Sequence, residues 1–168
     1  KNVYGKEDTL VTIQIDMLLA EKFGMYYIDE NGEKARPLII HRSSIGCYER
    51  TLAMLIEKYN GAFPMWLPPE QARVLSLTDR TADKAKEVRD KLFDLGLRAE
   101  ADVRSEKLGK KIREAQLDKV PYIIVIGDKE AEQNVISVRH RSEGDLGTMT
   151  VEEFVAKALL EVATKEIK

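Results

Sequence analysis

The chain has 168 residues, of which 43% are hydrophobic and 33% are charged, as in folded globular proteins. No apolar run approaches the roughly 20 residues that span a bilayer, so we expect no membrane segment. The net charge of −2 argues against a uniformly basic protein that coats nucleic acid, although a local positive face could still bind RNA. The single cysteine, Cys47, excludes an internal disulfide framework and is typical of a reducing, cytoplasmic compartment. Because the first residue is Lys1 rather than Met, we expect a piece of a longer protein.

The first third of the chain predicts a small antiparallel sheet with one helix. Hydrophobic patterning favours strands over residues 10–17, 25–28 and 36–41. Residues 29–32 carry the hairpin signal Asn-Gly, and Ser43 or Ser44 could cap the helix that follows. Such a set of elements buries too little surface to be stable alone, so we expect it to form the edge of a larger sheet.

A proline-rich stretch over residues 60–69 predicts a domain boundary, with domains at 1–63 and 64–168. Beyond it, strands are expected over 74–77, 97–103, 122–126 and 134–139, and helices over 81–95, 106–117 and from the capping box 150–153 onward. Strand and helix in alternation predict an α/β domain with three layers and a mostly parallel sheet.

Two of these helices have apolar faces that we expect to point inward. The first face consists of Ala85, Val88, Leu92 and Leu95. The second consists of Phe154, Val155, Leu159 and Val162.

Candidate chemistry in the first domain is limited to two places. Gly46 and Arg50 lie where a strand passes into a helix, which is typical of sites for anionic ligands, although a solvated helix face is the more frequent meaning of this pattern. His41 ends an apolar strand, where a hydrogen-bonded core histidine is more frequent than a metal ligand. No Ser-His-Asp set, CxxC pair, P-loop or dinucleotide fingerprint is present in the sequence.

A basic cluster marks the second domain, diluted by acidic residues. Its members are Arg104, Lys107, Lys110, Lys111, Arg113, Lys119, Arg139 and Arg141. An ordinary charged helix face explains the pattern as well as a ligand site does. The position of the cluster, around strand and helix ends of an open sheet, favours RNA recognition.

Several strings together resemble the threonyl form of class II aminoacyl-tRNA synthetases. Residues 37–42 (PLIIHR) followed by Gly46, Glu49 and Arg50 resemble motif 3 of that class. The other matching strings are residues 62–67 (AFPMWL), 105–114 (SEKLGKKIRE), 120–130 and 144–149. The resemblance begins near Thr12, and the prolyl, histidyl and glycyl relatives share the fold without this combination.

The resemblance implies a C-terminal portion: the end of a catalytic domain with an antiparallel sheet, followed by an anticodon-binding domain. It implies the charging of threonine tRNA with threonine by ATP with Mg, in a homodimeric enzyme of which this chain alone is inactive. Arg50 would hold ATP with Cys47 beside it, Gln14 would line the amino-acid pocket, and His41 would be one of three protein ligands of a zinc ion that binds threonine. We expect His41 and Arg50 to converge on a common hollow. A non-catalytic RNA-binding module or truncated paralogue is the alternative.

The resemblance also places a set of residues around the anticodon. These are Ser105, Lys107, Arg113, Lys119, Glu130 and Arg139. Some positions depart from the common family pattern: Ser105 replaces an asparagine, Cys47 replaces a serine, and residues 4–10 lack the Trp-Gln that precedes the pocket strand. Because of these departures, the fine contacts to adenine and to the anticodon could differ from those of the family.

Overall fold

The computed structural model describes residues 1–7 and 9–167. The chain folds into two compact units, Lys1–Asn60 and Gly61–Lys168, so the division falls at the start of the proline-rich stretch. Within the described residues, no helix combines the length and the apolar character needed to cross a membrane.

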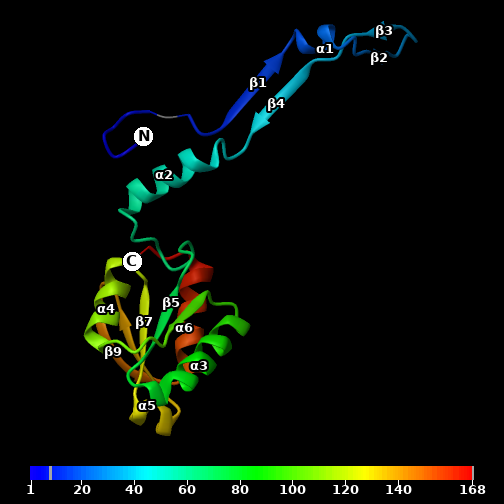
Figure 1. Cartoon of the computed structure of the whole chain (residues 1–168). Coiled ribbons are helices and arrows are strands. Elements are labelled where there is room, and N and C mark those ends of the chain that lie inside the picture. Colours follow the sequence, from blue (N-terminus) through cyan, green and yellow to red (C-terminus); the bar gives the residue numbers. More distant parts are fainter. Residues whose placement is uncertain (8, 168) are drawn as a thin grey trace. The chain divides into compact units, whose positions relative to one another are not determined.

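The first unit contains two separate antiparallel strand pairs and two helices (Figure 1). Its elements are β1 (Thr12–Asp16) paired with β4 (Ile39–Ser43), β2 (Tyr27–Ile28) paired with β3 (Lys34–Ala35), α1 (Leu19–Lys22) and α2 (Tyr48–Tyr59). The Asn31-Gly32 hairpin is confirmed: the Asp29 carboxylate accepts hydrogen bonds from the Asn31 and Glu33 amides, each at 2.9 Å. The third predicted strand starts later than expected, after Pro37, because proline has no amide to donate to a ladder.

Almost nothing in this unit is buried. Ala20 is its one buried hydrophobic residue among those described, and α2 buries none. Ile13, Ile15 and Ile40 lie on one face of the β1–β4 ribbon and are 68%, 59% and 66% exposed. This ribbon is the kind of two-stranded structure that is marginal in water without a further layer against it.

The start of α2 corrects the predicted serine cap. Ser43 is the last residue of β4, and the residue at the N-cap of α2 is Cys47. Between them the chain turns at Gly46, whose φ is +76° and where an added Cβ would lie 2.6 Å from the Leu10 carbonyl oxygen. The helix can begin only after this glycine turn, which places both serines too early to cap it.

The second unit is built on one five-stranded sheet with the order β6-β5-β7-β8-β9. The strands are β5 (Ala72–Ser76), β6 (Ala99–Asp102), β7 (Tyr122–Ile126), β8 (Ile136–His140) and β9 (Gly144–Met149). β5 runs parallel to both β6 and β7, whereas β8 opposes β7 and β9 opposes β8. All strands except β8 therefore run in the same direction, which confirms the mostly parallel sheet; β9 was not foreseen.

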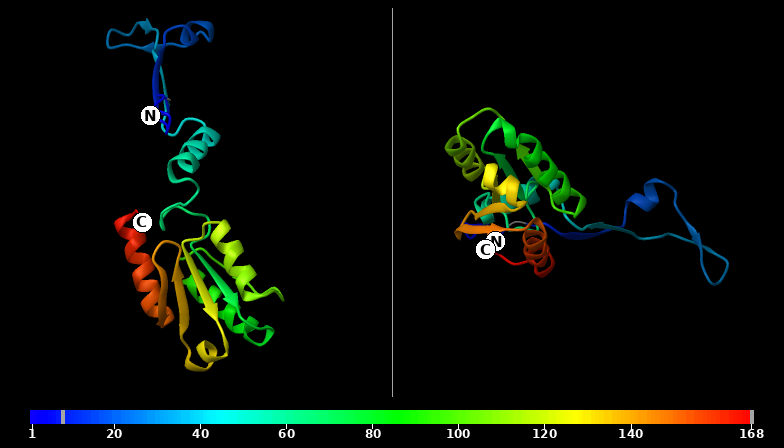
Figure 2. Two further views of the ribbon diagram at one scale, coloured as in Figure 1. Left: turned by 90° about the vertical axis from the view of Figure 1, so that its left-hand side faces the viewer. Right: turned by 90° about the horizontal axis from the view of Figure 1, so that it is seen from below.

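Helices cover both faces of this sheet, as Figures 1 and 2 show. The helical elements are η1 (Asp79–Thr81), α3 (Ala82–Asp94), α4 (Leu108–Leu117), α5 (Asp128–Gln133) and α6 (Val151–Thr164). α3 and α6 close the larger core, in which Val74, Ile124 and Phe154 are fully buried. α4 packs on the opposite face, where Ala115 contacts Leu75 and Ile123. The predicted three-layer α/β domain is confirmed.

Two of the expected inward residues are on the surface. Leu95 is 43% exposed because α3 ends at Asp94 and Gly96, with φ +91°, turns the chain so that Leu97 enters the core instead. Leu159 is 38% exposed, since Ala158 occupies the position of α6 that faces the sheet. The predicted capping box of α6 is confirmed, with reciprocal hydrogen bonds between Thr150 and Glu153.

Candidate nucleic-acid interface

Most of the predicted anticodon residues lie along α4 and the sheet face beneath it. α4 joins the end of β6 to the start of β7, and because these strands run in the same direction the helix must run back across the sheet. Ser105 and Lys107 precede its first turn, Arg113 lies within it, and Lys119 follows its last turn. Arg139 of β8 is opposite Ile123, which faces α4. We call the strip formed by these residues, which are Ser105, Lys107, Arg113, Lys119 and Arg139, the α4 strip.

One end of the α4 strip is a hollow at the edge where β5 and β6 end. Its volume is about 350 Å³, and its lining consists of Leu77, Thr78, Asp79, Arg104, Ser105, Glu106, Lys107 and Lys111. Glu130 belongs to α5, beyond the end of β7, and its Oε2 accepts a hydrogen bond from the Gly127 amide at 3.0 Å. A Cβ added to Gly127 would lie 3.1 Å from Leu77, so Glu130 stands beside this hollow. One carboxylate oxygen of Glu130 is therefore already used to cap α5.

The structure separates the basic cluster into cations held by the fold and cations left available. Arg104 is held by the Asp102 and Glu114 carboxylates, which raise its pKa, and the same contact lowers the pKa of Asp102. Lys110 pairs with Glu106 at 2.6 Å. Arg141 donates to the Lys119 and Ala62 carbonyls. Lys111 is buried.

Three of the predicted cations keep their charged groups unpaired. Among the described residues, the side chains of Lys107, Arg113 and Arg139 make no hydrogen bond or ion pair that could neutralise them. An unpaired guanidinium presents a planar fork of N–H donors, which suits phosphates and base edges. The available positive charge on this face thus coincides with the positions that the family resemblance selects.

A β-bulge interrupts the pairing of β8 with β9 at Arg139. The register between β8 and β9 shifts at Arg139, which then lies opposite Asp145 rather than Leu146. The Asp145 carboxylate does not pair with it; instead Oδ1 accepts the Gly147 amide at 2.8 Å, and Gly147 has a φ of +80°. Bulges of this kind redirect side chains beside functional sites.

In the first unit, Arg50 lines a small cavity of about 150 Å³ with Lys1, Asn2, Leu10, Ala53, Met54 and Glu57. Its Nη1 donates to the Thr9 carbonyl at 3.2 Å. Ligand pockets usually measure about 300–1,000 Å³, so this cavity is too small for a complete nucleotide site.

His41 and Gln14 are directly opposite each other on β4 and β1, so their side chains lie on the same face of the ribbon. The Nε2 atom of His41 is 3.5 Å from Oδ2 of Asp16. The pKa of Asp16 is lowered, first by hydrogen bonds from the Leu19 and Leu18 amides. His41 does not line the cavity beside Arg50, so within this unit the two predicted residues have different surroundings.

The remaining predicted residue of this unit, Cys47, is exposed, and its thiol donates to Oε2 of Glu49 at 2.7 Å. That bond is the main reason for the lowered pKa of Glu49. Across the described residues, no three His, Cys, Asp or Glu side chains gather as a metal site would require. A metal held by His41 therefore needs ligands beyond those that the described residues bring together.

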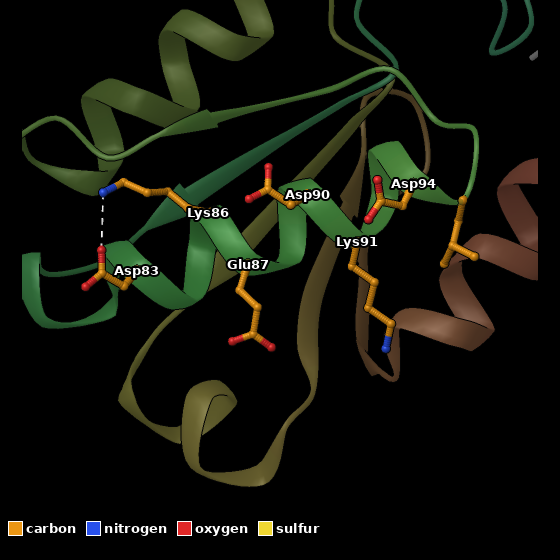
Figure 3. A pocket seen from close by; sticks show the side chains of 7 residues that line it. Asp83, Lys86, Glu87, Asp90, Lys91 and Asp94 are labelled. Atoms are coloured by element: carbon orange, nitrogen blue, oxygen red, sulfur yellow. Dashed lines mark hydrogen bonds and ion pairs between the residues drawn. The ribbon is translucent and has the colours of Figure 1, made fainter.

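Another hollow, of about 600 Å³, lies on the exposed side of α3 and is shown in Figure 3. Four acidic side chains extend from this one helix: Asp83, Glu87, Asp90 and Asp94. Lys86 pairs with Asp83 at 3.2 Å, and Lys91 pairs with Glu152 of α6. Because this surface is mainly acidic, it repels phosphate groups and is not a nucleic-acid interface.

The second unit is a three-layer α/β domain with unpaired cations beside α4, and the comparisons identify its family. The model of the anticodon binding domain family matches residues 71–161, and the chain belongs to this family. It is 62% identical over 166 residues to a threonine–tRNA ligase of Clostridium perfringens and 46% identical over 166 residues to that of Clostridioides difficile. Each alignment covers 99% of this chain and 26% of the relative, so the chain spans about a quarter of the curated relatives.

A solved structure gives the same result. The RNA binding domain of threonyl-tRNA synthetase from Cryptosporidium parvum matches with a TM-score of 0.78 at 33% identity, covering 95% of this chain and 40% of that one. The resemblance to the threonyl-tRNA synthetase family is thereby confirmed.

Proposed function

We propose that this chain is the part of a threonine–tRNA ligase that recognises the anticodon of threonine tRNA and contributes motif 3 to the ATP site. The observation that carries the proposal is the 62% identity to such a ligase over nearly the whole chain, across both units. The activity itself, charging of threonine tRNA with threonine at the expense of ATP, belongs to the longer enzyme.

Anticodon recognition is supported by the chemistry of the α4 strip. Single-stranded loops are recognised through unstacked bases, whose edges offer both donors and acceptors. Arg113 and Arg139 supply forked donors near the middle of the strip, and Lys107 supplies a point charge at its end. Ser105 adds a hydroxyl that can donate or accept, and Glu130 adds a carboxylate oxygen as acceptor. Lys119 completes the set next to Arg141 at the opposite end of α4.

The first unit would supply only part of a catalytic site. Arg50 would stabilise the charge of ATP bound with Mg, with Cys47 nearby and Gln14 facing the threonine pocket. The exposed isoleucines of the β1–β4 ribbon are explained if the rest of the catalytic domain, in the homodimeric enzyme, adds strands and helices against them. We place the enzyme in the cytoplasm, where tRNA is charged for translation.

A zinc ion fits His41 only as a shared ligand. His41 offers one imidazole nitrogen on the same face as Gln14, and the other ligands would come from the rest of the enzyme. Bound there, zinc would supply a Lewis acid for the amino and hydroxyl groups of threonine, and valine would be rejected for lack of the hydroxyl.

Binding of threonine tRNA transcripts with altered anticodons tests this function. We expect the cognate transcript to bind best, and Arg113→Ala or Arg139→Ala to weaken its binding by about 1–3 kcal/mol with loss of discrimination. Lys86→Ala is the matched control, because it removes an exposed cation from α3 on the other face of the sheet. Equal affinity for every anticodon would contradict the proposal.

A free RNA-binding module is the second candidate, favoured by one observation: among the described residues, the buried clusters lie in the second unit. The gene sequence upstream of Lys1 separates the two. A long upstream reading frame that encodes a cysteine and a second histidine for the zinc site supports the ligase, and a start codon close to Lys1 supports the module.

A further inference from the structure

Lys111 is the one basic residue of the cluster that the fold buries, with 2% of its surface exposed. Its Nζ donates to the Ser76 carbonyl at 3.0 Å, to the Ser76 hydroxyl at 3.3 Å and to the Asp102 carbonyl at 3.2 Å. All the donors of the ammonium group are therefore used inside the domain.

These acceptors mark the place where two parallel strands separate. Ser76 is the last residue of β5 and Asp102 is the last residue of β6, and the pairing between the strands ends at Leu75 and Asp102. Beyond this point the ladder no longer supplies donors to carbonyls at the strand ends. Lys111 supplies them from α4, so one side chain joins β5, β6 and α4.

Ion pairs of Arg104 also join the end of β6 to α4. The Asp102 carboxylate binds Arg104, and Arg104 also binds Glu114 of α4, each at 2.6 Å between Nη2 and the carboxylate. The segments that leave these strand ends carry Thr78, Ser105 and Lys107, all of which line the hollow at the end of the α4 strip. Lys111 and Arg104 line the same hollow.

Stability alone is a poor explanation for the buried lysine. Burying an ammonium group is unfavourable unless every donor is satisfied, and an apolar side chain of similar volume is often as stable or more so. The neighbouring inward positions of α4, Leu108 and Ala115, are apolar in the usual way. A buried lysine at this one position is therefore better explained by the geometry that it imposes.

We propose that Lys111 is a positioning residue that fixes Ser105 and Lys107 at the distance and angle needed to discriminate anticodon bases. This inference rests on the proposed function and deepens it. Base discrimination depends on hydrogen-bond geometry, whereas attraction to phosphate depends mainly on charge. Loss of Lys111 should therefore reduce the preference for the cognate anticodon more than the general affinity for RNA.

The test compares Lys111→Met with Lys110→Met in the full chain. Both variants remove one positive charge from adjacent positions of α4, but Lys110 is exposed and pairs only with Glu106. For each protein, the dissociation constants of a cognate and an anticodon-altered threonine tRNA transcript are measured at one salt concentration. We expect Lys111→Met to lower their ratio by about tenfold with little change for the altered transcript, and Lys110→Met to leave the ratio within about twofold.

Failure of the positioning role of Lys111 can be distinguished from failure of the proposed function. If the unmodified chain shows no anticodon preference, the proposed function fails. If the unmodified chain discriminates and folded Lys111→Met discriminates equally, or loses affinity for both transcripts alike, the positioning role is overturned.

If circular dichroism shows Lys111→Met to be unfolded, Ser76→Ala takes its place. This substitution keeps the lysine and both carbonyls and removes the hydroxyl, which accepts from Lys111 at 3.3 Å and donates to the Asp102 carbonyl at 3.5 Å. We expect the ratio to fall by about two- to threefold. An unchanged ratio in folded Ser76→Ala overturns the proposal.

Discussion

The two units place the same residue type in opposite environments. In the first, Ile13 and Ile40 lie on a paired strand and are mostly exposed. In the second, Ile124 and Ile136 also lie on paired strands and are fully buried. The strands differ in what surrounds them. β7 and β8 each pair on both sides and lie in a sheet with buried clusters on both faces, whereas β1 and β4 pair with each other and have no buried cluster against them among the described residues. Strand formation and burial are therefore separate properties of a sequence.

This contrast implies that the units differ in how independently they fold. The second unit contains two packed clusters of buried residues, and the first buries a single alanine among its described hydrophobic residues. Because burial of apolar surface is the main stabilising contribution to folding, the second unit should account for nearly all the stability of the chain.

Amide hydrogen exchange gives the largest expected difference. We predict that β7 is protected at least about a thousandfold more strongly than β1 and β4, because opening of β7 requires unfolding of the core whereas the ribbon can open locally. Exchange measured by NMR or mass spectrometry tests this. Comparable protection in the two units would mean that something covers the ribbon in solution, such as a second copy of the chain.

Two isoleucine substitutions, one in each unit, test this difference in burial directly. We expect Ile124→Ala to destabilise the second unit by about 2–5 kcal/mol through the cavity that it leaves. Ile40→Ala removes the same atoms from an exposed position and should change the unfolding free energy by no more than about 0.5 kcal/mol. Urea unfolding followed by far-ultraviolet circular dichroism, which records the helices and strands of both units, measures both effects. Equal effects of the two substitutions would refute the difference in packing.

The helix caps provide a smaller contrast. The Thr150 hydroxyl accepts the Glu153 amide at the start of α6, so Thr150→Ala should cost about 1 kcal/mol. Cys47 occupies the N-cap of α2 without a capping bond from its side chain, so Cys47→Ala should be nearly neutral. Urea unfolding of each variant followed by circular dichroism measures both, and a destabilisation by Cys47→Ala as large as that by Thr150→Ala would be the contrary result.

Much of the second unit could be predicted from the sequence because its signals are local. The apolar run at β7, the capping box of Thr150 and the glycine after α3 each identify an element without knowledge of its neighbours. The predictions failed where burial or strand pairing depends on neighbouring elements. Leu95 and Leu159 fit the apolar periodicity but fall outside the contact, and β9 became a strand by pairing with β8.

The predicted site residues divide in a similar way. The positions around the anticodon came from family strings, whereas the availability of Arg113 and Arg139 and the engagement of Arg104 depend on the fold. Lys111 was counted with the exposed cations, although its spacing from Leu108 and Ala115 already placed it on the inward face of α4. That periodicity was the one signal of its burial.

The sequence by itself determined four strands of the second unit (β5 to β8), its helices α3, α4 and α6, the cap of α6 and the family to which the chain belongs. These features depend on interactions between residues a few positions apart or on strings that can be matched directly. Only the tertiary structure decided which cations are free and which isoleucines are covered. Each of these depends on atoms brought together from distant parts of the chain, and local sequence patterns do not describe such long-range contacts.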